Sequence, residues 1–256
     1  MTIFYSITFF VFGLVLGSFY NVVGLRVPKK NFLSNDRSYC PTCHKQLSAI
    51  ELIPVISYLI QRGKCRGCGT EISAMYPLIE LLTGVGFLFS YLVYGLTIET
   101  VIALVAVSLS VIIIVTDLTY FLIPNNILLF FSPLIVVLRF VEPLDPWYSS
   151  LVGALIGFGL IFVVIVLSQG GMGAGDMKYF FVLGYLFGIS GVLLIFLLST
   201  LYGTLINIVS LLRGKVTRKS KVPFGPYISM AALTVLFAGD AIITWYFSFF
   251  QFVYKG

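Results

Sequence analysis

The chain has 256 residues, of which 59% are hydrophobic and only 10% are charged, and its mean hydropathy is +1.04. This composition lies far outside that of a soluble domain, so it excludes a soluble enzyme or binding module and indicates an integral membrane protein. We attribute the formal net charge of +6 to membrane topology and contact with anionic lipid, and expect no nucleic-acid partner.

The sequence predicts an all-α fold with eight transmembrane helices, because a span needs about 20 mostly apolar residues. The long apolar block at 177–212 is interrupted at Gly188-Ile-Ser-Gly191, so we expect two short spans there. The first span follows no Lys or Arg and ends in no small-residue cleavage site, so we expect a retained helix rather than a signal peptide. The expected spans are 3–25, 72–94, 98–116, 118–141, 147–167, the two halves of 177–212, and 227–253.

Lysine and arginine are concentrated in two loops, 26–71 and 213–222. Cytoplasmic loops carry an excess of basic residues, so we expect both loops on the cytoplasmic side and the N-terminus outside. Eight spans satisfy this rule and leave only Arg139 and Lys255 outside, whereas seven spans would place the second loop on the opposite face. The predicted domains are a first helix at 1–25, a cytoplasmic zinc-binding loop domain at 26–71 and a seven-helix membrane domain at 72–256.

All four cysteines lie in the first basic loop, in two C-x-x-C pairs: Cys40 with Cys43, and Cys65 with Cys68. Two such pairs supply four thiolates to a structural zinc ion and leave no open position. The alternative is a pair of disulfides, which a reducing cytoplasm disfavours. His44, the only histidine, is expected to be a bystander because the four thiolates already complete the site.

The single histidine excludes several mechanisms. No H-E-x-x-H motif is present, which excludes that class of metalloprotease, and no span contains a histidine to serve as the base of a serine protease. Cysteine catalysis is disfavoured because every thiol belongs to a C-x-x-C pair. Of the protease mechanisms considered, the one that uses carboxylates as acid and base remains.

Four acidic residues lie in or at the edge of predicted spans: Glu80, Asp117, Asp176 and Asp240. Ionisable groups in a span are costly and are therefore candidates for function. Asp117 ends one predicted helix and Asp176 begins another, both on the cytoplasmic side, so we expect them to meet as an aspartyl protease dyad. One carboxylate of such a pair keeps its proton near neutral pH, so the ionised member activates a water and the protonated member polarises the scissile carbonyl. Asp240 lies towards the outer half and is assigned no role.

Four glycines precede Asp176: Gly170, Gly171, Gly173 and Gly175. Without Cβ atoms they let a substrate backbone approach the acid and let the segment hinge. An ordinary turn between spans explains the glycines about equally well, and Asp117 alone is also explained as a helix-end residue paired with a cation. The two acids on one face together favour the protease interpretation.

These residues resemble the type IV prepilin leader peptidases, aspartyl intramembrane proteases with a G-x-G-D motif, matched here at 173–176. The resemblance extends along nearly the whole chain, through both C-x-x-C pairs and five further stretches: GLVLGSFYNVVGLRVP at 13–28, RGKCRGC at 62–68, YPLIELLTG at 76–84, DLTYFLIPN at 117–125 and VPFGPYI at 222–228. The sequence departs from many relatives in reading YNVVGLRVP, with Gly24, in a region linked to methyl transfer.

The resemblance implies that Asp117 and Asp176 are the catalytic pair, in the inner membrane and facing the cytoplasm. It implies prepilin or pseudopilin substrates, cut between glycine and a hydrophobic residue, usually phenylalanine, and then N-methylated with S-adenosylmethionine. No glycine-rich nucleotide fold is present to bind that cofactor. Glu80 is interpreted either as a residue that supports the methylation half or positions the new amine, or as a buried polar contact between helices. Lys178 is interpreted either as a partner of Asp176 or of lipid phosphate.

Two other functions are consistent with parts of the sequence. A proton-coupled transporter would use acids inside the membrane, but it is typically built from internal repeats, and none is evident. A zinc-bearing membrane scaffold would dock a partner on the loop and would have no need of the two aspartates. The clustering of acids at one interface favours the protease over both.

Overall fold

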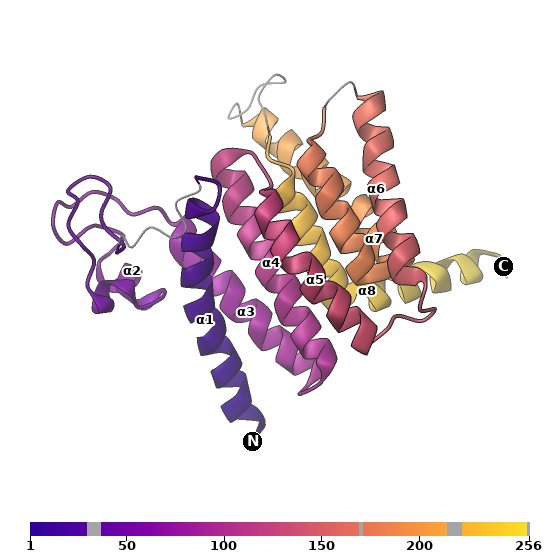
Figure 1. The fold of residues 1–256 in the computed structure, drawn as a ribbon, viewed down its shortest axis with the longest axis horizontal. Coiled ribbons are helices and arrows are strands. Elements are labelled where there is room, and N and C mark those ends of the chain that lie inside the picture. The colour runs from indigo at the N-terminus through magenta and orange to yellow at the C-terminus, as the bar shows by residue number, and fades with distance from the viewer. Residues whose placement is uncertain (30–36, 169–170, 214–221, 255–256) are drawn as a thin grey trace. The chain divides into compact units, whose positions relative to one another are not determined.

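The computed structural model describes residues 1–29, 37–168, 171–213 and 222–254. Gly170, Lys255 and most of the second basic loop lie outside these residues. In the described part the regular structure is helical, with two isolated β-bridges, and confirms the all-α prediction (Figure 1). The elements are α1 (Thr2–Arg26), η1 (Ala49–Leu52), α2 (Ile56–Ile60), α3 (Met75–Tyr94), α4 (Ile98–Tyr120), α5 (Asn125–Val141), α6 (Ser149–Leu167), α7 (Ala174–Leu212) and α8 (Gly225–Tyr254).

Within this part, six helices have the length and hydropathy of membrane spans, and α5, with 17 residues, is a shorter apolar helix. The chain is therefore a multi-pass membrane protein. It forms two compact units, Met1–Tyr120 and Phe121–Gly256. This division differs from the expected segments at 1–25, 26–71 and 72–256, which remain a prediction.

The first unit packs α1 against α3 and α4 through small residues. A Cβ atom on Gly13 would lie 2.8 Å from the Cα of Gly84, and one on Gly17 would lie 2.7 Å from the Cα of Glu80. Close backbone approach through small residues spaced four apart is a common way to associate helices in a membrane, where lipid provides no hydrophobic force between them. The loop between α1 and α3 carries η1, α2 and the four cysteines.

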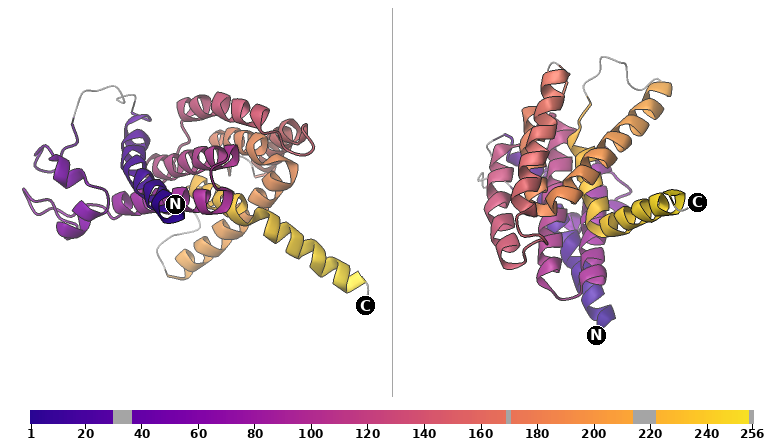
Figure 2. Two further views of the ribbon diagram at one scale, coloured as in Figure 1. Left: turned by 90° about the horizontal axis from the view of Figure 1, so that it is seen from below. Right: turned by 90° about the vertical axis from the view of Figure 1, so that its right-hand side faces the viewer.

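The second unit is built around α7, which packs on α5, α6 and α8. Gly153 of α6 and Gly184 of α7 let the two helix backbones come into direct contact, because a Cβ atom on either glycine would overlap the backbone of the other helix. Figure 2 shows the last part of α8 running away from α6 and α7.

Helix α7 is bent at Gly188, which has φ 71° and ψ −167° inside an otherwise helical segment. Figure 1 shows the two legs of α7 meeting at this bend, with both far ends towards the same side of the unit. The predicted interruption at 188–191 is therefore confirmed, although only Gly188 leaves the helical conformation. Within the described residues, the two legs and the six other long helices correspond to the eight expected segments, although the first leg of α7 is shorter than a full membrane span.

The bend leaves backbone groups without their helical partners, and neighbouring helices satisfy them. Arg139, buried in the last turn of α5, donates from Nε to the carbonyl of Leu186 at 2.8 Å. The N–H of Ile189 donates to Oγ of Ser149, at the start of α6, at 3.2 Å. Such pairing is required because an unsatisfied backbone group costs several kcal/mol in lipid. Arg139, expected only as a residue on the outer side, thus has a structural role.

Gly188→Ala is expected to destabilise the protein by about 1–3 kcal/mol, because its φ and ψ are essentially restricted to glycine. The new Cβ would also lie 2.5 Å from Oγ of Ser149. Thermal unfolding in detergent micelles measures the effect. Gly159→Ala is the matched control, since a Cβ atom there meets nothing within 4 Å. Equal melting temperatures for the two variants would contradict this account of the bend.

The boundary between α4 and α5 differs from the prediction of spans at 98–116 and 118–141. Helix α4 continues to Tyr120, and α5 begins only at Asn125, after Pro124. Proline disfavours helical conformation in the residue before it and is well placed at a helix start, which explains the later beginning. Asp117 consequently lies within the last turn of α4.

Candidate functional sites

Asp117 is buried, with 5% of its surface exposed. The end of α4 that carries it is held against the end of α1 by two contacts. The hydroxyl of Tyr120 donates to the carbonyl of Leu25 at 2.8 Å, and Gly24 lies directly against Val115. A Cβ atom on Gly24 would be 2.5 Å from Val115, so this departure from the common family sequence has a packing explanation in the structure.

Asp176 is the third residue of α7 and is 8% exposed. Its Oδ2 accepts a hydrogen bond from the backbone N–H of Gly173 at 3.0 Å. A carboxylate is favoured at this position because the N-terminus of a helix has free N–H groups and a positive partial charge. The sequence thus places a carboxylate at a helix N-terminus, where it accepts a backbone N–H.

Of the glycines before Asp176, Gly175 packs against another part of the second unit and Gly173 lies beside Asp176 itself. A Cβ atom on Gly175 would lie 3.1 Å from the Cβ of Ile123, and one on Gly173 would lie 3.3 Å from Oδ2 of Asp176. Gly175 therefore lets the start of α7 approach the connection before α5. The predicted role of Gly173 and Gly175 in substrate access remains a prediction.

The first turns of α7 contact both α5 and α8 through the two polar residues Lys178 and Tyr179, which follow Asp176 closely in the sequence. Lys178 donates from Nζ to Oδ1 of Asn125 at 2.9 Å. The buried hydroxyls of Tyr179 and Ser229 lie 3.1 Å apart and join α7 to α8. Sequence reasoning did not identify Tyr179 or Ser229. The only signal was the position of Tyr179 three residues after Asp176, on the same helix face.

The two other acids have different surroundings. Glu80 is buried in α3 and its Oε2 accepts the N–H of Val55, from the loop, at 2.7 Å. This contact joins α3 to the loop rather than to another helix, and it does not test the methylation role. Asp240 is exposed in α8. Asp117 belongs to the first compact unit and Asp176 to the second, so their pairing remains a prediction.

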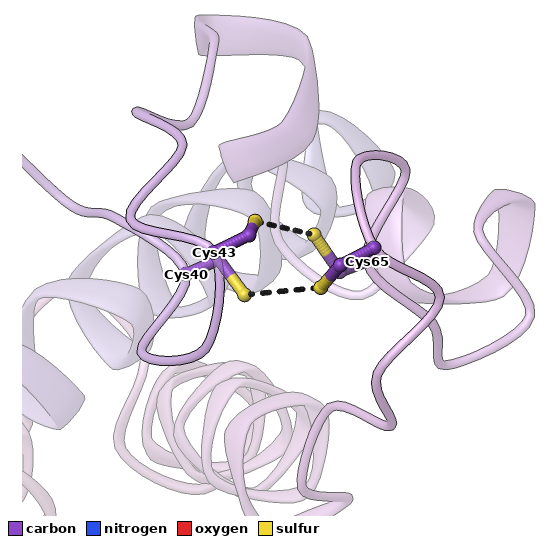
Figure 3. Close-up of side chains that lie close together, drawn as sticks. Cys40, Cys43 and Cys65 are labelled. Atoms are coloured by element: carbon purple, nitrogen blue, oxygen red, sulfur yellow. Dashed lines mark hydrogen bonds between the residues drawn. The ribbon is translucent and has the colours of Figure 1, made fainter.

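The four cysteines form one cluster. The Sγ atoms of Cys40 and Cys68 are 3.8 Å apart, those of Cys43 and Cys65 are 3.9 Å apart, and all four lie within 4.8 Å of one another. Figure 3 shows Cys40 and Cys43 on one side of the cluster, facing Cys65 on the other. Tetrahedral coordination at a Zn–S distance of about 2.3 Å separates the sulfurs by about 3.8 Å, so the cluster fits such an ion. A bonded sulfur pair would be about 2.05 Å apart, so the thiols are free.

The two C-x-x-C turns have the same construction. Each is closed by an antiparallel bridge, Tyr39 with Gln46 and Lys64 with Glu71. The residue after the second cysteine has positive φ in both turns, 55° at His44 and 73° at Gly69. The His44 ring stacks on Tyr39 and is not part of the metal-binding cluster, which agrees with the expected bystander role.

The two thiols of the first turn differ in acidity. The N–H of Lys45 lowers the pKa of Cys43, but burial and the three other thiols outweigh it and raise that pKa to about 11. Peptide groups favour the thiolate form, which a metal needs, at Cys40. The backbone N–H of Cys43, and then that of Thr42, lowers the pKa of Cys40 to about 6. Glu51 fixes the adjoining η1 segment. It accepts hydrogen bonds from the N–H and hydroxyl of Ser48, both at 2.9 Å, and pairs with Lys45 at 3.0 Å. These partners lower the pKa of Glu51 to about 2, so it stays ionised at neutral pH.

Comparisons with known proteins agree with this architecture. Residues 11–94 match the model of the bacterial peptidase A24 N-terminal domain, and residues 104–208 match that of the type IV leader peptidase family. No solved structure matches the chain.

Three relatives named prepilin leader peptidase/N-methyltransferase illustrate the similarity. The protein from Bacillus subtilis (strain 168) is 40% identical over 93% of this chain and 96% of its own length. Those from Aeromonas salmonicida (strain A449) and Neisseria gonorrhoeae are 31% and 32% identical, over 93% and 91% of this chain and 92% and 90% of their own lengths. The chain is a polytopic membrane protein with a tetracysteine loop. It belongs to the type IV leader peptidase family.

Proposed function

We propose that this protein is a membrane-embedded aspartyl endopeptidase that removes the basic leader of type IV prepilins or pseudopilins and N-methylates the new N-terminus. The observation that carries the proposal is the full-length similarity to relatives named for both activities. Two buried aspartates at helix ends, in matching motifs, supply the chemistry. Asp117 and Asp176 are the proposed catalytic pair.

In the proposed mechanism one aspartate is ionised and the other keeps its proton, since two adjacent carboxylates cannot both ionise cheaply. The hydrogen bond from Gly173 to Asp176 favours Asp176 as the ionised member. The carboxylate of Asp176 removes a proton from water, and the water oxygen attacks the scissile carbonyl carbon. At the same time Asp117 donates a proton to the carbonyl oxygen. Collapse of the tetrahedral intermediate breaks the C–N bond, and the leaving amine takes a proton from the dyad.

The chain itself limits how far apart the two aspartates can lie. Asp117 is six residues before Ile123, and Ile123 lies against Gly175, next to Asp176. Six residues span at most about 21 Å when fully extended. This limit allows the proposed pairing.

We propose an orientation in which both aspartates lie at the cytoplasmic ends of their helices and the N-terminus is outside. The positive-inside distribution of lysine and arginine supports it. A prepilin keeps its basic leader in the cytoplasm and its apolar helix in the bilayer, so its scissile bond would then reach the acids. Cleavage after glycine and before a hydrophobic residue follows from the family resemblance.

We propose zinc as the ion held by Cys40, Cys43, Cys65 and Cys68, in a structural role. Four thiolates leave no open position for a substrate or water. For S-adenosylmethionine no complete site is evident in the described residues. The cavity of about 520 Å³ beside α1 contains Arg26 and Arg37, which suit a carboxylate, but its lining has no aromatic ring for adenine and no acid for the ribose hydroxyls. Methylation therefore rests on the relatives.

The function can be tested with the purified protein in lipid vesicles and a prepilin that has a basic leader ending in glycine before phenylalanine. Mass spectrometry is expected to show loss of the leader at that bond. It should also show the added mass of one methyl group when S-adenosylmethionine is present. A substrate left intact, under conditions in which the Bacillus subtilis relative cuts it, would refute the protease function. Cleavage without methylation would refute only the second activity.

A further inference from the structure

The loop between α1 and α3 exposes an unusual amount of apolar surface. Six large aliphatic side chains within eleven residues are 40–67% exposed: Ile50, Leu52, Ile53, Ile56, Leu59 and Ile60. We call residues 50–60, which include most of η1, all of α2 and the residues between them, the aliphatic segment. A cluster of this kind on a polar loop marks an interaction surface, because soluble surfaces rarely gather so many large apolar side chains.

One contact fixes the depth of the aliphatic segment relative to a membrane span. The N–H of Val55 donates to Oε2 of Glu80, and Glu80 is the sixth residue of α3. It therefore lies about 7.5 Å along the helix from Met75, at about 1.5 Å per residue. Helix α3 has 20 residues and so spans about 30 Å, the thickness of the hydrocarbon core. Val55 is thus held at the boundary of that core rather than in water.

The charges beside the aliphatic segment complement a lipid surface. Arg62, Lys64 and Arg66 follow it directly and are all exposed. Residues 53–70 contain no acidic residue. Of the acids on either side, Glu51 is paired with Lys45, and the exposed Glu71 lies opposite Lys64 in the second cysteine turn. Basic residues next to an apolar face are typical of segments that lie in the interface of an anionic bilayer.

We infer that the aliphatic segment is an interfacial membrane anchor. Its isoleucine and leucine side chains enter the acyl region, and Arg62, Lys64 and Arg66 lie among anionic headgroups. The spans at both ends of the loop already keep it near the bilayer. The anchor therefore does not bring the loop to the membrane but fixes its position there. As a result, the four-cysteine cluster is held at the membrane surface.

The anchor can be tested by tryptophan fluorescence in the full-length protein, independently of any peptidase activity. Phenylalanine first replaces the two natural tryptophans, the exposed Trp147 and Trp245. Single tryptophans are then introduced as Leu59→Trp or Ile60→Trp, with Gln46→Trp, exposed in the first cysteine turn, as the matched control. Each variant is reconstituted in phosphatidylcholine–phosphatidylglycerol vesicles with or without bromine on the acyl chains.

The tryptophans at 59 and 60 are expected to emit at shorter wavelength and to lose intensity with brominated lipid, and the one at 46 to do neither. Replacing phosphatidylglycerol by phosphatidylcholine is expected to reduce the quenching, because the basic residues lose their partners. Water-like emission without quenching at both 59 and 60 would overturn the inference. A shift without quenching would also overturn it. If dilution with excess lipid abolished such a shift, the surface would bind a second copy, and if only added prepilin produced it, the surface would bind substrate.

Discussion

Replacing Asp176 by asparagine is expected to lower the rate of leader removal by about 10³-fold, and replacing Asp117 by asparagine by a similar factor. Asparagine keeps the size of the side chain but can neither take a proton from water nor donate one to the carbonyl oxygen. At Asp176 it also loses the charge that the N–H of Gly173 stabilises. The rate is measured in vesicles by the appearance of mature pilin, at substrate concentrations above and below KM.

Asp240→Asn is the matched control for this pair, because Asp240 is also an acid in a membrane helix but is exposed on α8. It should cut at the wild-type rate. The double variant Asp117→Asn/Asp176→Asn should be little slower than either single variant, since both residues act in one step. Wild-type cleavage by either single variant would refute the dyad. The transporter or scaffold interpretation would then become the better explanation of the buried acids.

Cys65→Ser is expected to lose the bound metal entirely and to unfold the loop between α1 and α3. Cys65 is buried, and the N–H of Gly67 donates to its Sγ, so the residue contributes to both the metal site and the turn. Binding of structural zinc by small peptides is worth about 10–16 kcal/mol, more than a loop this short is expected to recover from its other contacts. Zinc content by atomic spectroscopy and trypsin cleavage at the loop lysines and arginines measure the two effects.

The variant His44→Gly tests whether His44 is a metal ligand or only a neighbour of the metal site. It removes the only histidine but suits the positive φ of 55°, as Gly69 does in the second turn. The variant should keep one zinc per chain and resist trypsin as well as the wild type. If it lost the metal, His44 would be a ligand and the four-thiolate site would be wrong. If Cys65→Ser kept one zinc per chain, the cluster would not be the metal site.

Local patterns in the sequence predicted the elements that depend on local chemistry. Apolar runs located the long helices, C-x-x-C spacing located the cysteine cluster, and Gly188 marked the bend in α7. The start of α5 was predicted too early because hydropathy stays high through 118–124. Pro124 interrupts the helical backbone there without changing the hydropathy.

Contacts between residues far apart in the sequence could not be predicted from local patterns. Nothing in the sequence around Arg139 indicates that its guanidinium bonds to the carbonyl of Leu186, 47 residues away. The position of the aliphatic segment likewise depends on the bond between Val55 and Glu80, 25 residues apart. The dyad was inferred from topology and resemblance, because a pairing of helix ends depends on how whole helices are arranged.

The bend at Gly188 has a consequence for biosynthesis. The first leg of α7, from Ala174 to the bend, is about 21 Å long at about 1.5 Å per residue, too short to cross a hydrocarbon core of about 30 Å as a separate insertion step. The two legs must therefore enter the bilayer together. Arg139 and Ser149, which satisfy the polar groups at the bend, belong to α5 and α6 and leave the ribosome earlier. Because synthesis proceeds from the N-terminus, Arg139 and Ser149 are already present when the two legs of α7 enter the bilayer and their bend requires hydrogen-bond partners.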